Sequence, residues 1–286
     1  MKSTDWILRV VKGMFIGTGF ILPGVSGGAL AAIFGIYERL IGFLANLTKD
    51  FIKNLLYFVP VGIGAFVSVV LCSVALTYFF DFYMVEILWF FAGCIIGTLP
   101  ALWAQAGEHG RKPFHYGVLI ISAVAGYIFL FLIKNIAAEI PANFVTWIIA
   151  GAIMALGFLV PGLSPSNFLL YMGMYDKMTA GFKALDFGVL VPIGIGGLVC
   201  VLALSKFFEW LIKKYHAGLF HFILGIVTAS TIMILPLPIN FDYLDITYTY
   251  FAGAGTAICA IAAVLGIALG WWMSRLEEKY KPDKGF

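Results

Sequence analysis

Charged residues are scarce in this chain. Asp, Glu, Lys and Arg make up 12% of its 286 residues, about half of the roughly 25% that is typical of a soluble domain. No polar stretch is long enough to form a second domain, and the net charge of +3 is not gathered into a patch of the kind that binds nucleic acid. The composition excludes an ordinary soluble enzyme and predicts one integral membrane domain over residues 1–286.

Motifs that accompany catalysis or nucleotide-driven pumping are also missing. The chain has no His-Glu-x-x-His, Gly-x-Ser-x-Gly or P-loop sequence, so it encodes neither a familiar hydrolase nor an ATPase. Its 4 cysteines fall within apolar stretches, away from any Cys or His at the spacing of a metal site. Its 4 histidines lie at the edges of those stretches, where an interfacial role is the simpler interpretation. We expect no catalytic residue, no metal and no cofactor.

Long apolar stretches fill most of the chain. Each is near or above the roughly 20 residues that a helix needs to cross a bilayer. They cover approximately residues 54–80, 87–104, 114–133, 187–210, 218–236 and 248–273. The basic N-terminal region also resembles the start of a secretory signal, but residues 13–37 are mirrored by an internal segment, so we expect them in the mature protein. The pattern predicts an all-α, polytopic membrane protein.

A short motif rich in helix-breaking residues occurs twice. Residues 23–28 read Pro-Gly-Val-Ser-Gly-Gly, and residues 161–166, an offset of 138, read Pro-Gly-Leu-Ser-Pro-Ser. Each copy is followed at the same distance by Gly-x-Tyr-acid-base. These later residues are Gly35, Tyr37, Glu38 and Arg39 in the first copy and Gly173, Tyr175, Asp176 and Lys177 in the second. Helix breakers and charges at matching places in two halves of a membrane protein indicate a transport site.

The apolar arms beside each motif are short. Ten uncharged residues separate Lys12 from Pro23, and as a helix they would cover about 15 Å, half the hydrocarbon thickness of a bilayer. We therefore interpret residues 6–47 and 144–183 as re-entrant helical hairpins whose tips carry the Pro-Gly motifs. Irregular backbone at that depth is tolerated only when it is buried in protein or lines a wet cavity. Arms that cross the membrane completely stay an alternative.

The repeat extends into the stretches that follow each motif. The Pro-x-Gly-x-Gly sequence of residues 60–64 recurs at residues 192–196, an offset of 132. Repeat one would cover about residues 6–134 and repeat two about residues 144–273, each with one hairpin and three transmembrane helices. Because three crossings are an odd number, the two would be inverted repeats, an architecture common among secondary transporters.

The basic residues indicate the orientation of the chain. With the N-terminus in the cytoplasm, 15 of the 18 Lys and Arg residues fall on the cytoplasmic side, including Arg9 and Lys12. This agrees with the positive-inside rule and predicts two cytoplasmic termini. Arg9 and Lys12 could also recruit an anionic head group from the cytoplasmic leaflet. The count does not distinguish re-entrant arms from spanning arms, because two arms preserve the parity of crossings.

The hairpin tips combine groups that suit an anion. A helix that begins at a break leaves N–H groups unpaired and carries about half a positive charge there. Arg39 can hold a phosphate bidentately, whereas Lys177 offers only a point charge. The candidate phosphate-binding residues are Ser26, Gly27, Gly28, Glu38, Arg39, Ser164, Ser166, Asn167, Asp176 and Lys177. Two simpler interpretations stay open: the motifs only turn the chain and cap helices, and the charged pairs only close the hairpins at the interface.

The combination of Leu22–Gly28, Gly35–Arg39 and Gly157–Ser166 resembles the bacterial undecaprenyl-phosphate translocase family, and the resemblance covers nearly the whole chain. Ala29 stands where the resemblance leads us to expect a hydroxyl residue. The resemblance implies a lipid flippase of the bacterial cytoplasmic membrane, which returns undecaprenyl phosphate or a related polyprenyl phosphate from the outer to the inner leaflet. That recycling would serve peptidoglycan and other cell-envelope synthesis. Alternating access around the two tips would carry the phosphate while the tail stays among the membrane lipids.

Two other classes of function stay open on the sequence. The same tips could serve a secondary transporter of a small organic anion or ion, which predicts a closed aqueous vestibule rather than a groove open to lipid. A scaffold for envelope enzymes predicts that tip substitutions leave function intact. Proton or sodium coupling and the oligomeric state are left open: Glu38, Asp176 and Glu86 could carry a proton, but no sequence feature shows that they do.

Overall fold

The computed structural model of the chain describes residues 3–22, 27–36, 39–40, 42–43, 50–137, 140–159, 166–235 and 254–279. Every regular element in these ranges is an α-helix. In chain order the helices are α1 (Ser3–Ile21), α2 (Gly27–Ile33), α4 (Phe51–Phe82), α5 (Met84–Ala106), α6 (Pro113–Ala137), α7 (Phe144–Leu159), α8 (Ser166–Tyr171), α9 (Tyr175–Lys183), α10 (Phe187–Ile234) and α12 (Ala254–Lys279). The all-helical class predicted from the sequence is confirmed over this part of the chain.

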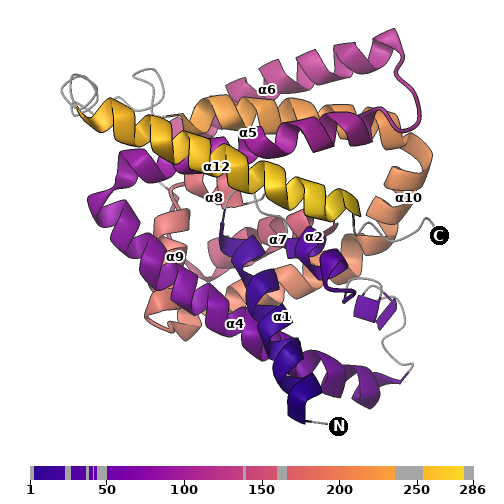
Figure 1. The fold of residues 1–286 in the computed structure, drawn as a ribbon, viewed down its shortest axis with the longest axis vertical. Helices are drawn as coiled ribbons and strands as arrows, with labels where there is room; N and C mark the ends of the chain where they lie inside the picture. The colour runs from indigo at the N-terminus through magenta and orange to yellow at the C-terminus, as the bar shows by residue number, and fades with distance from the viewer. Residues whose placement is uncertain are drawn as a thin grey trace.

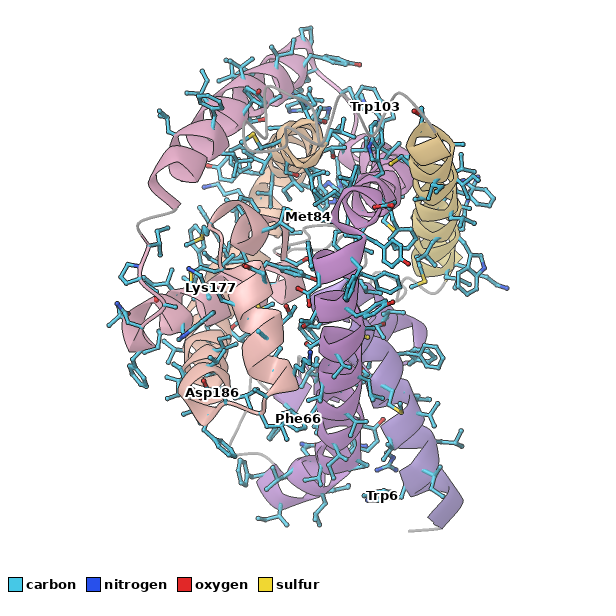
Figure 2. All side chains as sticks on the ribbon, turned by 90° about the vertical axis from the view of Figure 1, so that its left-hand side faces the viewer. Trp6, Phe66, Met84, Trp103, Lys177 and Asp186 are labelled. Atoms are coloured by element: carbon cyan, nitrogen blue, oxygen red, sulfur yellow. The ribbon has the colours of Figure 1, made fainter. Side chains whose placement is uncertain are left out.

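Six helical segments among the described residues are long and apolar enough to cross a membrane. They are Phe51–Phe82, Met84–Ala106, Pro113–Leu132, Phe187–Ile212, Lys214–Ile234 and Gly255–Leu276. Each coincides with one apolar stretch of the sequence; residues 248–253 of the last stretch lie outside the described ranges. In the most apolar 18-residue segment of α6, and likewise of α12, only 17% of the segment is buried inside the protein. Apolar side chains surround the helices in Figure 2. So much exposed apolar surface belongs in lipid, and the chain is a multi-pass membrane protein.

The helices stop on both sides of each Pro-Gly motif. α1 ends at Ile21 and α2 begins at Gly27, while α7 ends at Leu159 and α8 begins at Ser166. The second helix of each pair is short, with 7 residues in α2 and 6 in α8. Such helices are about 10 Å long, well short of a hydrocarbon core of about 30 Å. The intervening motif residues lie outside the described ranges.

Glycines that the repeat aligns make matching helix contacts. A Cβ on Gly64 of α4 would overlap the carbonyl oxygen of Val10 in α1, and a Cβ on Gly196 of α10 would overlap that of Ile148 in α7. The residue numbers of Gly64 and Gly196 differ by 132, the offset of the Pro-x-Gly-x-Gly sequences. The numbers of their partners, Val10 and Ile148, differ by 138, the offset of the Pro-Gly motifs. α1 therefore packs backbone to backbone on α4, as α7 packs on the first part of α10. Helices approach this closely only where a small residue faces the neighbour.

The later helices pair across the two repeats. A Cβ on Gly93 of α5 would overlap the carbonyl oxygen of Ala263 in α12, and one on Gly225 of α10 would overlap that of Leu119 in α6. With the repeat bounds expected from the sequence, α5 and α6 fall in the first repeat and α10 and α12 in the second, so the second span of each expected repeat packs on the third span of the other. Figure 1 shows α5, α6, α12 and the second part of α10 together at one end of the molecule, with α1, α4 and α9 toward the other end. Helices from the N-terminal half of the chain therefore pack directly on helices from the C-terminal half.

Candidate functional site

The turn that follows each short helix has the same structure in both repeats. Gly35 and Gly173 have φ angles of 67° and 61°, in the left-handed region that glycine adopts without steric cost. The Ile36 N–H donates to the carbonyl oxygen of Ala31 at 2.8 Å, and the Met174 N–H donates to that of Leu169 at 2.9 Å. This is the Schellman arrangement that ends a helix at glycine. The repeated Gly-x-Tyr sequence thus stops α2 and α8 at equivalent points.

Tyr175, directly after the second turn, contacts the first repeat. Its hydroxyl donates a hydrogen bond of 2.6 Å to the carbonyl oxygen of Ile21, and the two residues are 1% and 0% exposed. The last carbonyl groups of a helix have no partner within the helix, and a buried one needs another donor. The Tyr175 ring also packs against Phe80 and Phe91, with centroids 5.7 and 6.5 Å away. The end of α1, two residues before Pro23, is therefore held by the second repeat.

Arg39 lies against the start of α4. Its Nε donates a hydrogen bond to Oδ1 of Asn54 at 3.1 Å, and its guanidinium carbon lies 3.6 Å from the centre of the Tyr57 ring. The guanidinium carbon of Arg9, in α1, lies 4.1 Å from the centre of the same ring. The face of an aromatic ring attracts a cation, by about 0.5–2 kcal/mol. One tyrosine thus holds two like charges near each other, a position that a bound anion would stabilise.

Lys12 adds a third cation from α1. Its Nζ donates a hydrogen bond of 3.0 Å to the carbonyl oxygen of Phe34, one residue after the end of α2. We call Arg9, Lys12 and Arg39, which are all half-buried, the basic cluster. Among the described residues one carboxylate, that of Asp5, forms an ion pair with the cluster, through Arg9. The cluster has three positive charges, and the one carboxylate that pairs with it cancels only one of them. The cluster therefore carries a net positive charge, which suits the binding of an anion.

The structure describes part of each tip. Gly27 and Gly28 are buried at the start of α2, and a Cβ on Gly27 would come within 3.3 Å of α1. Ser166 begins α8 and is 2% exposed, and Asn167 follows it in the same helix. Three further candidates, Ser26, Glu38 and Ser164, lie outside the described ranges. Gly27, at the end of the first motif, is thus packed against the helix that carries Arg9 and Lys12.

Asp176 and Lys177 stand apart from the basic cluster. Both are exposed in the first turn of α9, where the negative charge of Asp176 interacts favourably with the helix dipole. Figure 2 shows Lys177 midway along the molecule, whereas Trp6, one turn before Arg9, lies at the lower end. The structure brings Arg39 together with Arg9, and among the described residues no contact joins it to Lys177.

Three residues of this region were not selected from the sequence. Tyr175 had a visible signal, because Gly-x-Tyr recurs at the offset of the repeat. Asn54 and Tyr57 belong to no motif and stand near the beginning of an apolar stretch. They become partners of Arg39 only through the packing of α4, which a linear pattern does not encode.

Comparison with known proteins assigns the chain to a family. Residues 16–250 match the model of the VCA0040-like family, which is described as undecaprenyl phosphate translocase-like. The chain belongs to this family. A polyprenyl-phosphate transporter of Vibrio cholerae is 24% identical over 250 residues, which cover 82% of this chain and 79% of the relative. Another from Staphylococcus aureus is 27% identical over 257 residues, 84% of this chain and 90% of the relative. No solved structure matches the chain significantly.

The match to the translocase-like family takes in most of the candidate site. It begins at residue 16 and includes both Pro-Gly motifs, Tyr175, and Arg39 with its partners Asn54 and Tyr57. Arg9 and Lys12 precede the matched region. The resemblance read from the motifs is confirmed, and Arg39 is the member of the basic cluster that lies within the match.

Proposed function

We propose that this protein transports a polyprenyl phosphate, such as undecaprenyl phosphate, from the outer to the inner leaflet of the bacterial cytoplasmic membrane. The carrier lipid would then be available again for cell-envelope synthesis. Membership of the translocase-like family and two relatives named polyprenyl-phosphate transporter support the class of substrate. The single observation that carries the proposal is the stacking of Arg9 and Arg39 on Tyr57.

The basic cluster would replace the water around the phosphate. A phosphate monoester carries about −1.5 to −2 charges at neutral pH, and its unaided burial is very costly. Arg39 uses Nε for Asn54, and the described residues offer no acceptor to its two Nη groups. Those groups have the fork geometry that binds two oxygens of one phosphate. Arg9 would add charge from the other contact on Tyr57, while the polyprenyl tail stays in lipid.

The two Pro-Gly tips would form the moving part. We interpret the repeats as inverted and the hairpins as re-entrant, with both termini in the cytoplasm. The matching glycine contacts of α1–α4 and α7–α10 and the matching turns at Gly35 and Gly173 support equivalent units. Rocking of the units about the tips would expose the phosphate to each leaflet in turn. In this mechanism the serines, glycines, Asn167 and Glu38 line the path, and Lys177, which follows Asp176, receives the phosphate from the outer side.

Arg39→Ala in the purified, reconstituted protein tests the proposal. Labelled undecaprenyl phosphate is placed in the outer leaflet of liposomes, and its loss from that leaflet is measured. A charged hydrogen bond contributes about 1.5–3 kcal/mol, so we expect transport to fall by about ten- to a hundredfold. Arg39→Lys keeps the charge but not the fork and should be intermediate. Lys183→Ala, an exposed cation at the end of α9, is the matched control.

Two outcomes would contradict the proposal. Unchanged lipid transport by the Arg39→Ala variant at equal reconstitution would remove the basic cluster from the mechanism. Uptake of a soluble phosphate ester, with no movement of the lipid, would instead favour a transporter of small organic anions.

A further inference from the structure

All 4 histidines of the chain gather in one region. His109 and His115 flank the connection between α5 and α6, and His216 and His221 lie in the second part of α10. The ring centroids of His109 and His216 are 4.3 Å apart, and those of His115 and His221 are 5.1 Å apart. Figure 1 shows this connection and the bend of α10 on the same side of the molecule, at the right. The sequence alone does not show this grouping, because the two members of each pair come from distant segments.

Three side chains in this region have the composition of a transition-metal site. One ligand atom each from Glu108, His109 and His216 lies within 4.8 Å of the other two, and Nε2 of His216 is 3.6 Å from Oε2 of Glu108. Ligand atoms around a tetrahedral zinc ion lie about 3.4 Å apart, since each is about 2.0–2.1 Å from the metal. Two imidazoles and one carboxylate form a known zinc ligand set, which leaves a fourth position for water. A small movement of exposed side chains would complete the geometry.

We propose that Glu108, His109 and His216 bind a divalent transition-metal ion of the zinc class. The site lies outside the basic cluster and is independent of the transported substrate. Glu108 and His109 are exposed and His216 is half-buried, so an ion can reach the three ligands from the protein surface. Neutral imidazole nitrogens favour zinc, nickel and copper, whereas magnesium and calcium prefer all-oxygen sites.

The surroundings hold the ligands in place. Gly107 and Gly110 close the turn that carries Glu108 and His109, with the Gly110 N–H donating to the carbonyl oxygen of Gly107 at 3.0 Å. The ring of His216 packs on Phe220, with centroids 4.5 Å apart. A metal ligand set on a short turn and a packed helix needs little ordering when the ion binds.

The neighbouring cations are directed onto aromatic rings. The guanidinium of Arg111 lies over Trp103, with its carbon 4.4 Å from the ring centre. The Nζ of Lys214 lies 5.1 Å from the ring centre of Trp210 and 5.3 Å from that of Tyr215. Their charges are thus partly compensated by the ring faces, and the carboxylate of Glu108 provides the negative charge nearest to the ion.

A metal ion bound by Glu108, His109 and His216 would stabilise the bend in α10. Tyr215 has non-helical angles, φ −128° and ψ 33°, which divide α10 into its two apolar segments. His216 is the next residue, while Glu108 and His109 belong to the α5–α6 connection. A bound ion would therefore tie the bend of the second repeat to a loop of the first, and it would restrict the angle between the segments of α10.

Zinc binding to the full-length protein tests this proposal. The protein is purified without a polyhistidine tag, and zinc is titrated at pH 7.5 against a chromogenic chelator, with the bound metal quantified by mass spectrometry. We expect one zinc per chain and a higher unfolding temperature with zinc, because a ligand that binds only the folded state stabilises it. His216→Gln and Glu108→Gln should each weaken binding by at least about tenfold, since even changes outside the ligand shell cost about 10–100-fold.

The control is His115→Asn, which lies outside the triad and keeps an acceptor for the Lys112 N–H that contacts His115 Nδ1 at 3.2 Å. It should bind zinc like the unsubstituted protein. Equal zinc affinity in the His216→Gln variant, or no stoichiometric binding by the unsubstituted protein, would overturn the proposal. If His216→Gln fails to fold, the Glu108→Gln variant and the direct titration decide the question.

Discussion

The hydroxyl of Tyr175 donates a 2.6 Å hydrogen bond to the carbonyl oxygen of Ile21, joining the beginning of α9 to the end of α1. Both residues are buried, and they belong to different repeats. The bond connects the Gly-x-Tyr turn of the second repeat to the helix that leads into the first Pro-Gly motif.

Tyr175→Phe is expected to destabilise the protein. The change leaves the buried carbonyl oxygen of Ile21 without its donor, which costs about 1–3 kcal/mol. The unfolding temperature of the detergent-purified protein should fall accordingly. Tyr78→Phe is the control, because Tyr78 is 53% exposed on α4 and its hydroxyl donates no hydrogen bond to the described residues. An equal effect of the two substitutions would show that the bond to Ile21 contributes nothing specific.

The ring of Tyr57, rather than its hydroxyl, should matter for transport. Tyr57→Phe keeps an aromatic face for Arg9 and Arg39, whereas Tyr57→Leu removes it and loses about 0.5–2 kcal/mol for each contact. We expect the leucine variant to transport polyprenyl phosphate several-fold more slowly in liposomes and the phenylalanine variant to remain close to the unsubstituted protein. Equal activity of both variants would show that stacking does not position the arginines.

The two glycines of each Pro-x-Gly-x-Gly sequence should differ in their tolerance of alanine. A Cβ on Gly64 or Gly196 would overlap the backbone of the facing helix, whereas Gly62 and Gly194 have nothing within 4 Å of an added Cβ. Overpacking costs about 1–3 kcal/mol, so Gly64→Ala and Gly196→Ala should lower the unfolding temperature. Gly62→Ala and Gly194→Ala are the matched controls. Different behaviour of Gly64 and Gly196 would argue against equivalent helix pairs.

Gly35 should accept asparagine better than alanine. Its φ of 67° is left-handed, and nothing lies within 4 Å of an added Cβ, so the penalty comes from the backbone alone. A left-handed conformation costs about 1–2 kcal/mol for most L-residues and less for asparagine. The unfolding temperature should therefore be highest for the unsubstituted protein, lower for Gly35→Asn and lowest for Gly35→Ala. An alanine variant as stable as the unsubstituted protein would indicate that this turn is not retained in solution.

Individual residues of the candidate site could be predicted from the sequence, but the contacts between them could not. Arg39 was selected from the sequence because a charge beside an apolar stretch is costly and therefore informative. Its pairing with Arg9 on Tyr57 was not foreseen, since the three residues share no spacing. Lys177, which occupies the position equivalent to Arg39, is exposed on α9 and has no comparable partner among the described residues. Equivalent positions in a repeat share backbone structure more faithfully than side-chain contacts.

The sequence by itself determined the six apolar spans and the helix breaks around the Pro-Gly motifs, and it showed the recurrence of Gly-x-Tyr at which the structure places the two turns. These features depend on hydropathy and backbone preference within one continuous segment, so a local pattern is enough to predict them. Only the tertiary structure decided that α5 packs on α12, that Arg9 meets Arg39 on Tyr57, and that His216 reaches Glu108. Such contacts join distant segments, and they depend on how closely small residues let the helices approach, which no single segment encodes.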